Sequence, residues 1–290
     1  MNESQTLESA VSIETLGSAR IKSPPSLSNP HVSWLSWQRA LGIAFAVVTQ
    51  LVFFWTALSL FFFLRDGSSI AGNAFVANVL LAVFFAWPHS LLLVPSIQKR
   101  LKQHIPAGLI GCVHCLATCI SLLVLFAFWT RTSGSLWVLT GSGAVLMQVG
   151  FYASWLGLFY SLYWTGLGYQ TGATQAWYWF RQLPPPIRKF EGRGAFRYMR
   201  HPVYLSFLGL IWFTPIMTWD HVVLTFIWTL YIFLGSYFKD RRMMHYLGNA
   251  YREYASRVPG YPLIGFGPMG RLPLELSTEM VPTNPGPLRP

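Results

Sequence analysis

The sequence predicts an all-α polytopic membrane protein, and two observations carry that prediction. Of the 290 residues, 53% are hydrophobic and only 11% are charged, whereas a soluble domain carries about a quarter charged residues. The few charges lie between long uncharged runs, and a helix needs roughly 20 apolar residues to cross the hydrocarbon layer. About six hydrophobic helices are therefore expected. They fall within the uncharged runs 40–64, 67–98, 103–130, 132–180, 201–219 and 221–238.

The longest of these runs, residues 132–180, predicts a single span. Two crossings here would place the basic residues that follow on the opposite side of the membrane from the other basic clusters. We therefore expect one span that ends near Trp164. Glycines at 166, 168 and 172 interrupt the segment after it, which is expected to lie in the interface or to fold back.

The last two runs predict a tight helical hairpin, because they are short and only Asp220 separates them. A charged turn at 239–242 is expected to follow the hairpin. Residues 238–256 then predict an amphipathic helix, since their apolar side chains recur at helical spacing. Such a helix can lie on the membrane surface and cover a pocket that the hairpin opens.

Positive charge is distributed unevenly along the chain. With six crossings, all of the 21 Lys and Arg residues except Arg65 and Arg131 fall on one side. Basic residues near helix ends stay on the cytoplasmic side, so both termini are expected in the cytoplasm. The net charge of +11 follows from this topology and from contact with anionic membrane lipid. No motif indicates a nucleic-acid partner.

The chain divides into three parts by composition. Residues 1–38 are mostly polar and contain several prolines, which predicts a disordered cytoplasmic tail. Residues 39–266 form one membrane domain, and the proline-rich residues 267–290 predict a flexible C-terminal tail.

Three cysteines, Cys112, Cys115 and Cys119, share one helical face in the third run, beside His114. A zinc site needs four ligands, and a second ligand pair is absent from the sequence. We expect small residues that pack between helices, without a metal.

The sharper candidates for chemistry are polar residues placed where a bilayer makes them costly. His89 follows Pro88 near the end of the second run, and an intramembrane His is a functional candidate. The sequence Arg-His-Pro-Val-Tyr at 200–204 stands at the start of a predicted helix, whose free amides attract anionic groups. A carboxylate or ribose edge of a cofactor would fit there. The sequence lacks the strand-helix alternation of a Rossmann site, so membrane helices would have to hold a nucleotide-like cofactor.

These motifs resemble those of a known family. The order of motifs is Arg-His-Pro-x-Tyr at 200–204, a short hairpin, Gly-x-x-Tyr-x-x-Tyr at 248–254 and Val-Pro at 258–259. This order resembles that of the integral-membrane methyltransferases of the isoprenylcysteine carboxyl methyltransferase and phospholipid methyltransferase superfamily. Within it the chain is most similar to bacterial methanethiol S-methyltransferases, grouped with NnrU-type proteins. The resemblance runs from about residue 40 to 266, and it implies that 39–266 is a methyltransferase-like domain of the bacterial inner membrane.

The resemblance implies an S-adenosylmethionine cofactor between the hairpin and the C-terminal helix, and a small or lipophilic thiol acceptor, methanethiol giving dimethyl sulfide being favoured. Membrane lipid is the other expected partner, and no metal is required. A cation at Arg200 or Arg241 is the candidate catalytic group, since it would favour the thiolate. The cofactor-contacting positions that match the motif are Arg200, His201, Pro202, Tyr204 and Asp240.

The chain departs from the family pattern at several positions, one pair of which belongs to the cofactor site. A Glu-Glu pair usually follows the hairpin, and here those positions hold Lys239 and Asp240. Two alternatives therefore stay open: a haem-binding, NnrU-like isomerase in which His89 or His114, together with a Cys, ligates haem, and a non-catalytic membrane protein or a transporter.

Overall fold

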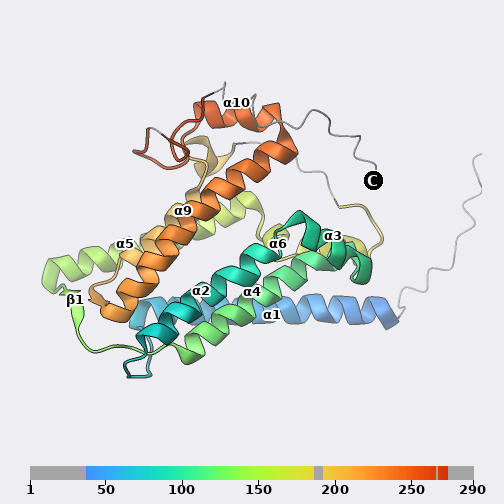
Figure 1. Ribbon diagram of the computed structural model, residues 1–290. Coiled ribbons are helices and arrows are strands. Elements are labelled where there is room, and N and C mark those ends of the chain that lie inside the picture. The colour runs from blue at the N-terminus through green and yellow to red at the C-terminus, as the bar shows by residue number, and fades with distance from the viewer. Residues whose placement is uncertain (1–36, 186–191, 266, 274–290) are drawn as a thin grey trace, which may run out of the picture. The chain divides into compact units, whose positions relative to one another are not determined.

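A computed structural model describes residues 37–185, 192–265 and 267–273. Most of the predicted membrane domain lies within these ranges, whereas most of the two predicted tails lies outside them. The predicted fold class is confirmed: the described chain is helical apart from one pair of short strands (Figure 1).

Helices suited to a membrane make up most of the fold. In the described ranges, four are long and apolar enough to cross a bilayer. A fifth crossing is made if α2 and α3, which bend by 70° at their junction, form one span. The elements concerned are α1 (Trp37–Asp66), α2 (Phe75–Leu91), α3 (Pro95–His104), α4 (Ile110–Phe128), α5 (Gly141–Thr165) and α9 (Trp219–Leu247).

The predicted hairpin has arms of unequal length. Its first helix, α8 (Pro202–Trp212), has 11 residues and is too short to cross a bilayer alone. The chain leaves the helix after Trp212, and β2 (Ile216–Thr218) pairs antiparallel with β1 (Ser135–Val138). All six predicted hydrophobic helices are therefore present, but α8 is not a full span.

The charged segment 239–242 is not a turn, so this prediction was wrong. Helix α9 continues through it to Leu247, because none of these four residues breaks a helix. The break comes at Gly248, whose φ of +55° lies in the left-handed region that favours glycine. The predicted amphipathic helix is accordingly divided between the end of α9 and α10 (Asn249–Arg257).

The glycine-interrupted segment after α5 folds back, as predicted. Gly166 ends α5 with a φ of +75°, and α6 (Leu167–Gln170) and α7 (Ala173–Phe180) follow. Helix α7 packs against α1 and α4. The approach requires glycine, because a Cβ at Gly172 would lie 2.3 Å from the backbone nitrogen of Cys112.

The core forms where α5 packs on α8, α4 packs on α1 and α2, and α2 packs on α9. In Figure 1, α2 and α9 run in similar directions. The C-terminal end of each helix is therefore the end nearer to α10. Buried side chains of one contiguous cluster fill the space between these helices. Its largest members include Phe63, Trp129, Phe151, Trp155 and Trp228.

Buried Asp220 fixes the opposite end of α9. Its carboxylate accepts hydrogen bonds from the indole Nε1 of Trp129 at 3.0 Å and from the backbone nitrogen of Thr132 at 3.1 Å. The Thr132 hydroxyl is a third partner, 3.2 Å away. Asp220 also lies in the first turn of α9, where a negative charge is favourable.

We expect Asp220→Ala to lower the free energy of unfolding by about 2–3 kcal/mol, because it leaves buried donors unpaired. The measurement is thermal or denaturant unfolding of the detergent-solubilised protein. Asp66→Ala is the matched control, since Asp66 is exposed and pairs only with its neighbour Arg65 in the described chain. Equal unfolding curves for the two variants would contradict the anchoring role of Asp220.

Candidate functional site

The candidate site forms where the start of α8, the last turns of α9 and the C-terminal segment meet. Backbone hydrogen bonds join the first two residues of the Arg-His-Pro-x-Tyr motif to the C-terminal segment. The amide of Arg200 donates to the carbonyl of Pro259 at 2.9 Å, and the amide of His201 donates to the carbonyl of Gly260 at 3.1 Å. The short 3-10 helix η2 (Gly194–Arg197) precedes the motif. The first two residues of the Arg-His-Pro-x-Tyr motif are thus bonded to the C-terminal segment.

Arg200 is buried, and its guanidinium is saturated by the protein. Nε and Nη2 donate to Oδ2 of Asp240 at 3.0 and 2.9 Å. Nη1 and Nη2 donate to backbone carbonyls between residues 255 and 270, at 2.8–3.1 Å. These bonds account for the five N–H groups of an arginine. Arg200 therefore holds the C-terminal segment against α9 and has no donor left for a thiolate.

Asp240 is the centre of this cluster. Its Oδ2 also accepts from Nε2 of His201 at 3.1 Å, and its Oδ1 accepts from the hydroxyl of Tyr251 on α10. Burial raises the pKa of Tyr251, and the adjacent Asp240 carboxylate adds to the shift. Both oxygens of Asp240 are occupied, so the carboxylate positions its neighbours.

His201 presents a free ring nitrogen inside the cluster. Its side chain is 0% exposed, and Nδ1 has no hydrogen-bond partner among the described residues. Burial lowers the pKa of His201 below its ordinary value, although the Asp240 carboxylate opposes the shift. With Nε2–H committed to Asp240, Nδ1 of the neutral ring is an acceptor.

Two further features of the motif can bind a ligand: the Tyr204 hydroxyl and the amides at the start of α8. The Tyr204 ring lies 5.5 Å from that of His201, and its hydroxyl has no hydrogen-bond partner in the described ranges. Pro202 occupies the first position of α8, and no side chain caps the amides that follow it. A buried acceptor, a phenol and uncapped amides fit the hydroxyls and the carboxylate of S-adenosylmethionine.

Lys239 turns away from Asp240, its neighbour in sequence. Its ammonium lies 5.2 Å from the centre of the Tyr204 ring and 5.8 Å from that of Phe196, in cation–π geometry. The cation that replaces a family carboxylate is therefore beside Tyr204. Arg241 lies apart from this cluster: its side chain is exposed and contacts Tyr237, one turn earlier on α9.

A second polar cluster lies between α2, α4 and α9. The rings of His89 and His114 are 5.1 Å apart, and His114 Nε2 donates to the backbone carbonyl of His89 at 3.2 Å. The Ser90 and Tyr231 hydroxyls are 2.8 Å apart. The sequence singled out both histidines, but it gave no signal that Tyr231 would reach them from α9.

The three cysteines are buried and unoxidised on α4. In the described part of the chain, no group of three or more His, Cys, Asp or Glu side chains is arranged to hold a metal ion. The rings of His89 and His114 pack against each other, and each ring uses one of its nitrogens in a hydrogen bond within the protein.

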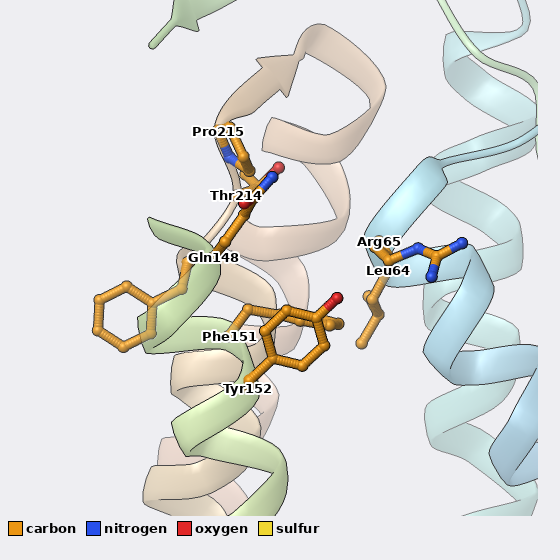
Figure 2. A pocket seen from close by; sticks show the side chains of 8 residues that line it. Leu64, Arg65, Gln148, Phe151, Tyr152, Thr214 and Pro215 are labelled. Carbon is orange, nitrogen blue, oxygen red and sulfur yellow. The ribbon is translucent and has the colours of Figure 1, made fainter. Parts of the chain in front are cut away.

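A separate pocket lies between the end of α1, the first half of α5 and the loop before β2 (Figure 2). Gln148 lines it, whereas Trp164 at the far end of α5 packs near η2. Those two residues are about 24 Å apart along the helix. None of the predicted site residues contributes to this pocket. It is lined by Leu64, Arg65, Gln148, Phe151, Tyr152, Phe213, Thr214 and Pro215.

Sequence comparison identifies relatives of this chain. Methanethiol S-methyltransferase 2 of Bradyrhizobium diazoefficiens is 29% identical over 65% of this chain and 73% of its own length. Methanethiol S-methyltransferase of a Pseudomonas species is 26% identical over 81% and 94%. Nurim of Xenopus laevis is 27% identical over 53% and 57%.

No family model matches the chain, and no solved structure matches it. Several methanethiol S-methyltransferases are nevertheless among its relatives. The predicted resemblance is thereby confirmed, and the chain is a relative of the methanethiol S-methyltransferases, among the membrane proteins that resemble isoprenylcysteine carboxyl methyltransferase.

Proposed function

We propose that this protein is an S-adenosylmethionine-dependent membrane methyltransferase that acts on a small or lipophilic thiol, with methanethiol the favoured acceptor. One observation carries the cofactor proposal: the buried His201 holds an unpaired Nδ1 beside Tyr204 and the uncapped start of α8. The names of the relatives support the reaction class and the acceptor.

In this proposal the residues of the site have two different roles. Arg200 and Asp240 position the site, because their polar atoms are bonded to each other, to His201, to Tyr251 and to the C-terminal carbonyls. His201, Pro202 and Tyr204 offer the contacts for the cofactor. A buried ion pair with fully satisfied partners gives a fixed frame, and misplacement by 1 Å can be costly for a transfer reaction.

Lys239 supplies the positive charge next to the cofactor contacts. Its ammonium lies over Tyr204 and favours an anionic group there, either the cofactor carboxylate or a thiolate. The cofactor supplies an electrophilic methyl group on a sulfonium, and the protein needs mainly to align the two sulfurs and exclude water. Thiols are uncharged when protonated and can reach a site among the helices from the membrane.

We expect Tyr204→Phe to weaken S-adenosylmethionine binding about 2–10-fold, the value of one hydrogen bond. His201→Ala should weaken it further, because it removes the unpaired acceptor and the bond to Asp240. Calorimetric titration of the purified protein in detergent measures both. Arg257→Ala is the control, since Arg257 is exposed on α10 and pairs with Glu253. Parent-like affinity in both site variants would rule out this site.

Asp240→Ala tests the positioning role. It leaves Arg200 as a buried, uncompensated charge, which costs about 3–5 kcal/mol. We expect lower unfolding stability together with weakened cofactor binding. A variant that keeps parent stability and parent affinity would contradict the role assigned to the ion pair.

The acceptor is tested by headspace analysis of the purified enzyme with methanethiol and S-adenosylmethionine. We expect dimethyl sulfide to accumulate, and to be lost in the His201→Ala variant. Methylation of a lipid or a prenyl thiol instead of methanethiol would overturn the acceptor proposal and leave the cofactor site standing.

A further inference from the structure

The second polar cluster, between α2, α4 and α9, takes no part in the cofactor contacts described above. It comprises His89, Ser90, His114, Thr118 and Tyr231. Its placement beside a hydrophobic core is costly unless its polar groups are paired or used. The hydrogen bonds within this cluster show which polar atom has no partner.

The hydrogen bonds of Thr118 define the tautomer of His89. The Thr118 hydroxyl donates to the backbone carbonyl of His114 at 2.8 Å, so its oxygen remains only as an acceptor. His89 Nδ1 lies 3.4 Å from that oxygen and must therefore carry the proton of the neutral ring. His89 Nε2 is then unprotonated, and it has no hydrogen-bond partner in the part of the chain that the structure describes.

The face of α9 opposite this imidazole carries cations and an open position. Tyr231, Gly235, Lys239 and Arg242 follow one another at helical spacing on that face. A Cβ at Gly235 would meet no heavy atom within 4 Å, so there is open space between Tyr231 and Lys239. The Tyr231 ring lies 6.2 Å from that of His89.

Tyr204 connects this face to the cofactor contacts. Lys239 lies over its ring, and Arg242 interacts electrostatically with Tyr204, with His89 and with His114. An anion formed near Gly235 would therefore lie close to two cations, Lys239 and Arg242, on the same face of α9.

We propose that the space over Gly235 receives the acceptor thiol and that His89 Nε2 is the catalytic base that removes its proton. This inference rests on the proposed function. The S–H proton passes to Nε2, and the sulfur keeps the electron pair. That pair forms the new bond to the methyl carbon, while the bond from this carbon to the donor sulfonium breaks. The products are a thioether and S-adenosylhomocysteine, and His89 returns its proton to water.

The test compares two thiols on one variant. Methanethiol must lose a proton to react, whereas thiophenol is largely ionised at mildly alkaline pH. We expect His89→Gln to lower kcat/KM for methanethiol about 100-fold, the usual range for a lost general base, and to change it by less than about threefold for thiophenol. His245→Gln is the matched control, because His245 is exposed near the end of the same helix α9.

A second pair of variants tests the same inference without removing the imidazole. Thr118→Val deletes the acceptor that sets the tautomer, and it should lower kcat/KM for methanethiol about tenfold while leaving thiophenol unchanged. Thr118→Ser keeps the hydroxyl and should behave like the parent.

The outcomes separate the two proposals. A parent enzyme that binds S-adenosylmethionine and methylates both thiols, with His89→Gln equally active on methanethiol, would overturn the role of His89 alone. Equal losses on both thiols in His89→Gln would also overturn it, because a base matters only for the protonated acceptor. A parent that binds no S-adenosylmethionine would overturn the proposed function and this inference with it.

Discussion

The ion pair between Arg200 and Asp240 is the interaction on which the candidate site depends. It joins three segments of the chain: the two residues before α8, the last turns of α9 and the carbonyls of residues 255–270. A buried pair of this kind is stabilising only when its remaining donors and acceptors are satisfied. Here His201, Tyr251 and four backbone carbonyls satisfy them, so His201 and Tyr204 are held in fixed positions beside the start of α8.

Helix α9 has two polar faces near its C-terminal end, and each face contacts different parts of the protein. One face carries Asp240 towards the motif and the C-terminal segment. The other carries Lys239, whose ammonium lies over Tyr204, and Arg242, which interacts electrostatically with the histidines of α2 and α4. Because the helix continues through 239–242 without a turn, consecutive residues point to different sides, and Lys239 and Asp240 cannot act as an equivalent pair. The replacement of a family carboxylate by Lys239 thus places a cation where an anionic acceptor or cofactor group would be stabilised.

Local patterns in the sequence predicted the hydrophobic helices, the single span from Gly141 to Thr165 and the fold-back after it, because uncharged runs and glycine breaks act over short distances. The continuity of α9 was also within reach, since residues 239–247 contain no glycine or proline and Gly248 follows them. Long-range contacts were not: the pairing of β1 with β2, the carbonyls around Arg200 and the approach of Tyr231 to His89 depend on tertiary packing. The family resemblance predicted that Arg200, His201 and Asp240 belong to one site. Only the structure shows that the polar atoms of Arg200 and Asp240 are all bonded within the protein.

The central claim is that this frame holds a nucleoside sulfonium cofactor, and equilibrium binding to the intact chain tests it most directly. Titration of the purified protein in detergent with S-adenosylmethionine should give saturable binding of one molecule per chain, and S-adenosylhomocysteine should compete for it. Absence of saturable binding by a folded protein, or binding that S-adenosylhomocysteine does not displace, would contradict the account.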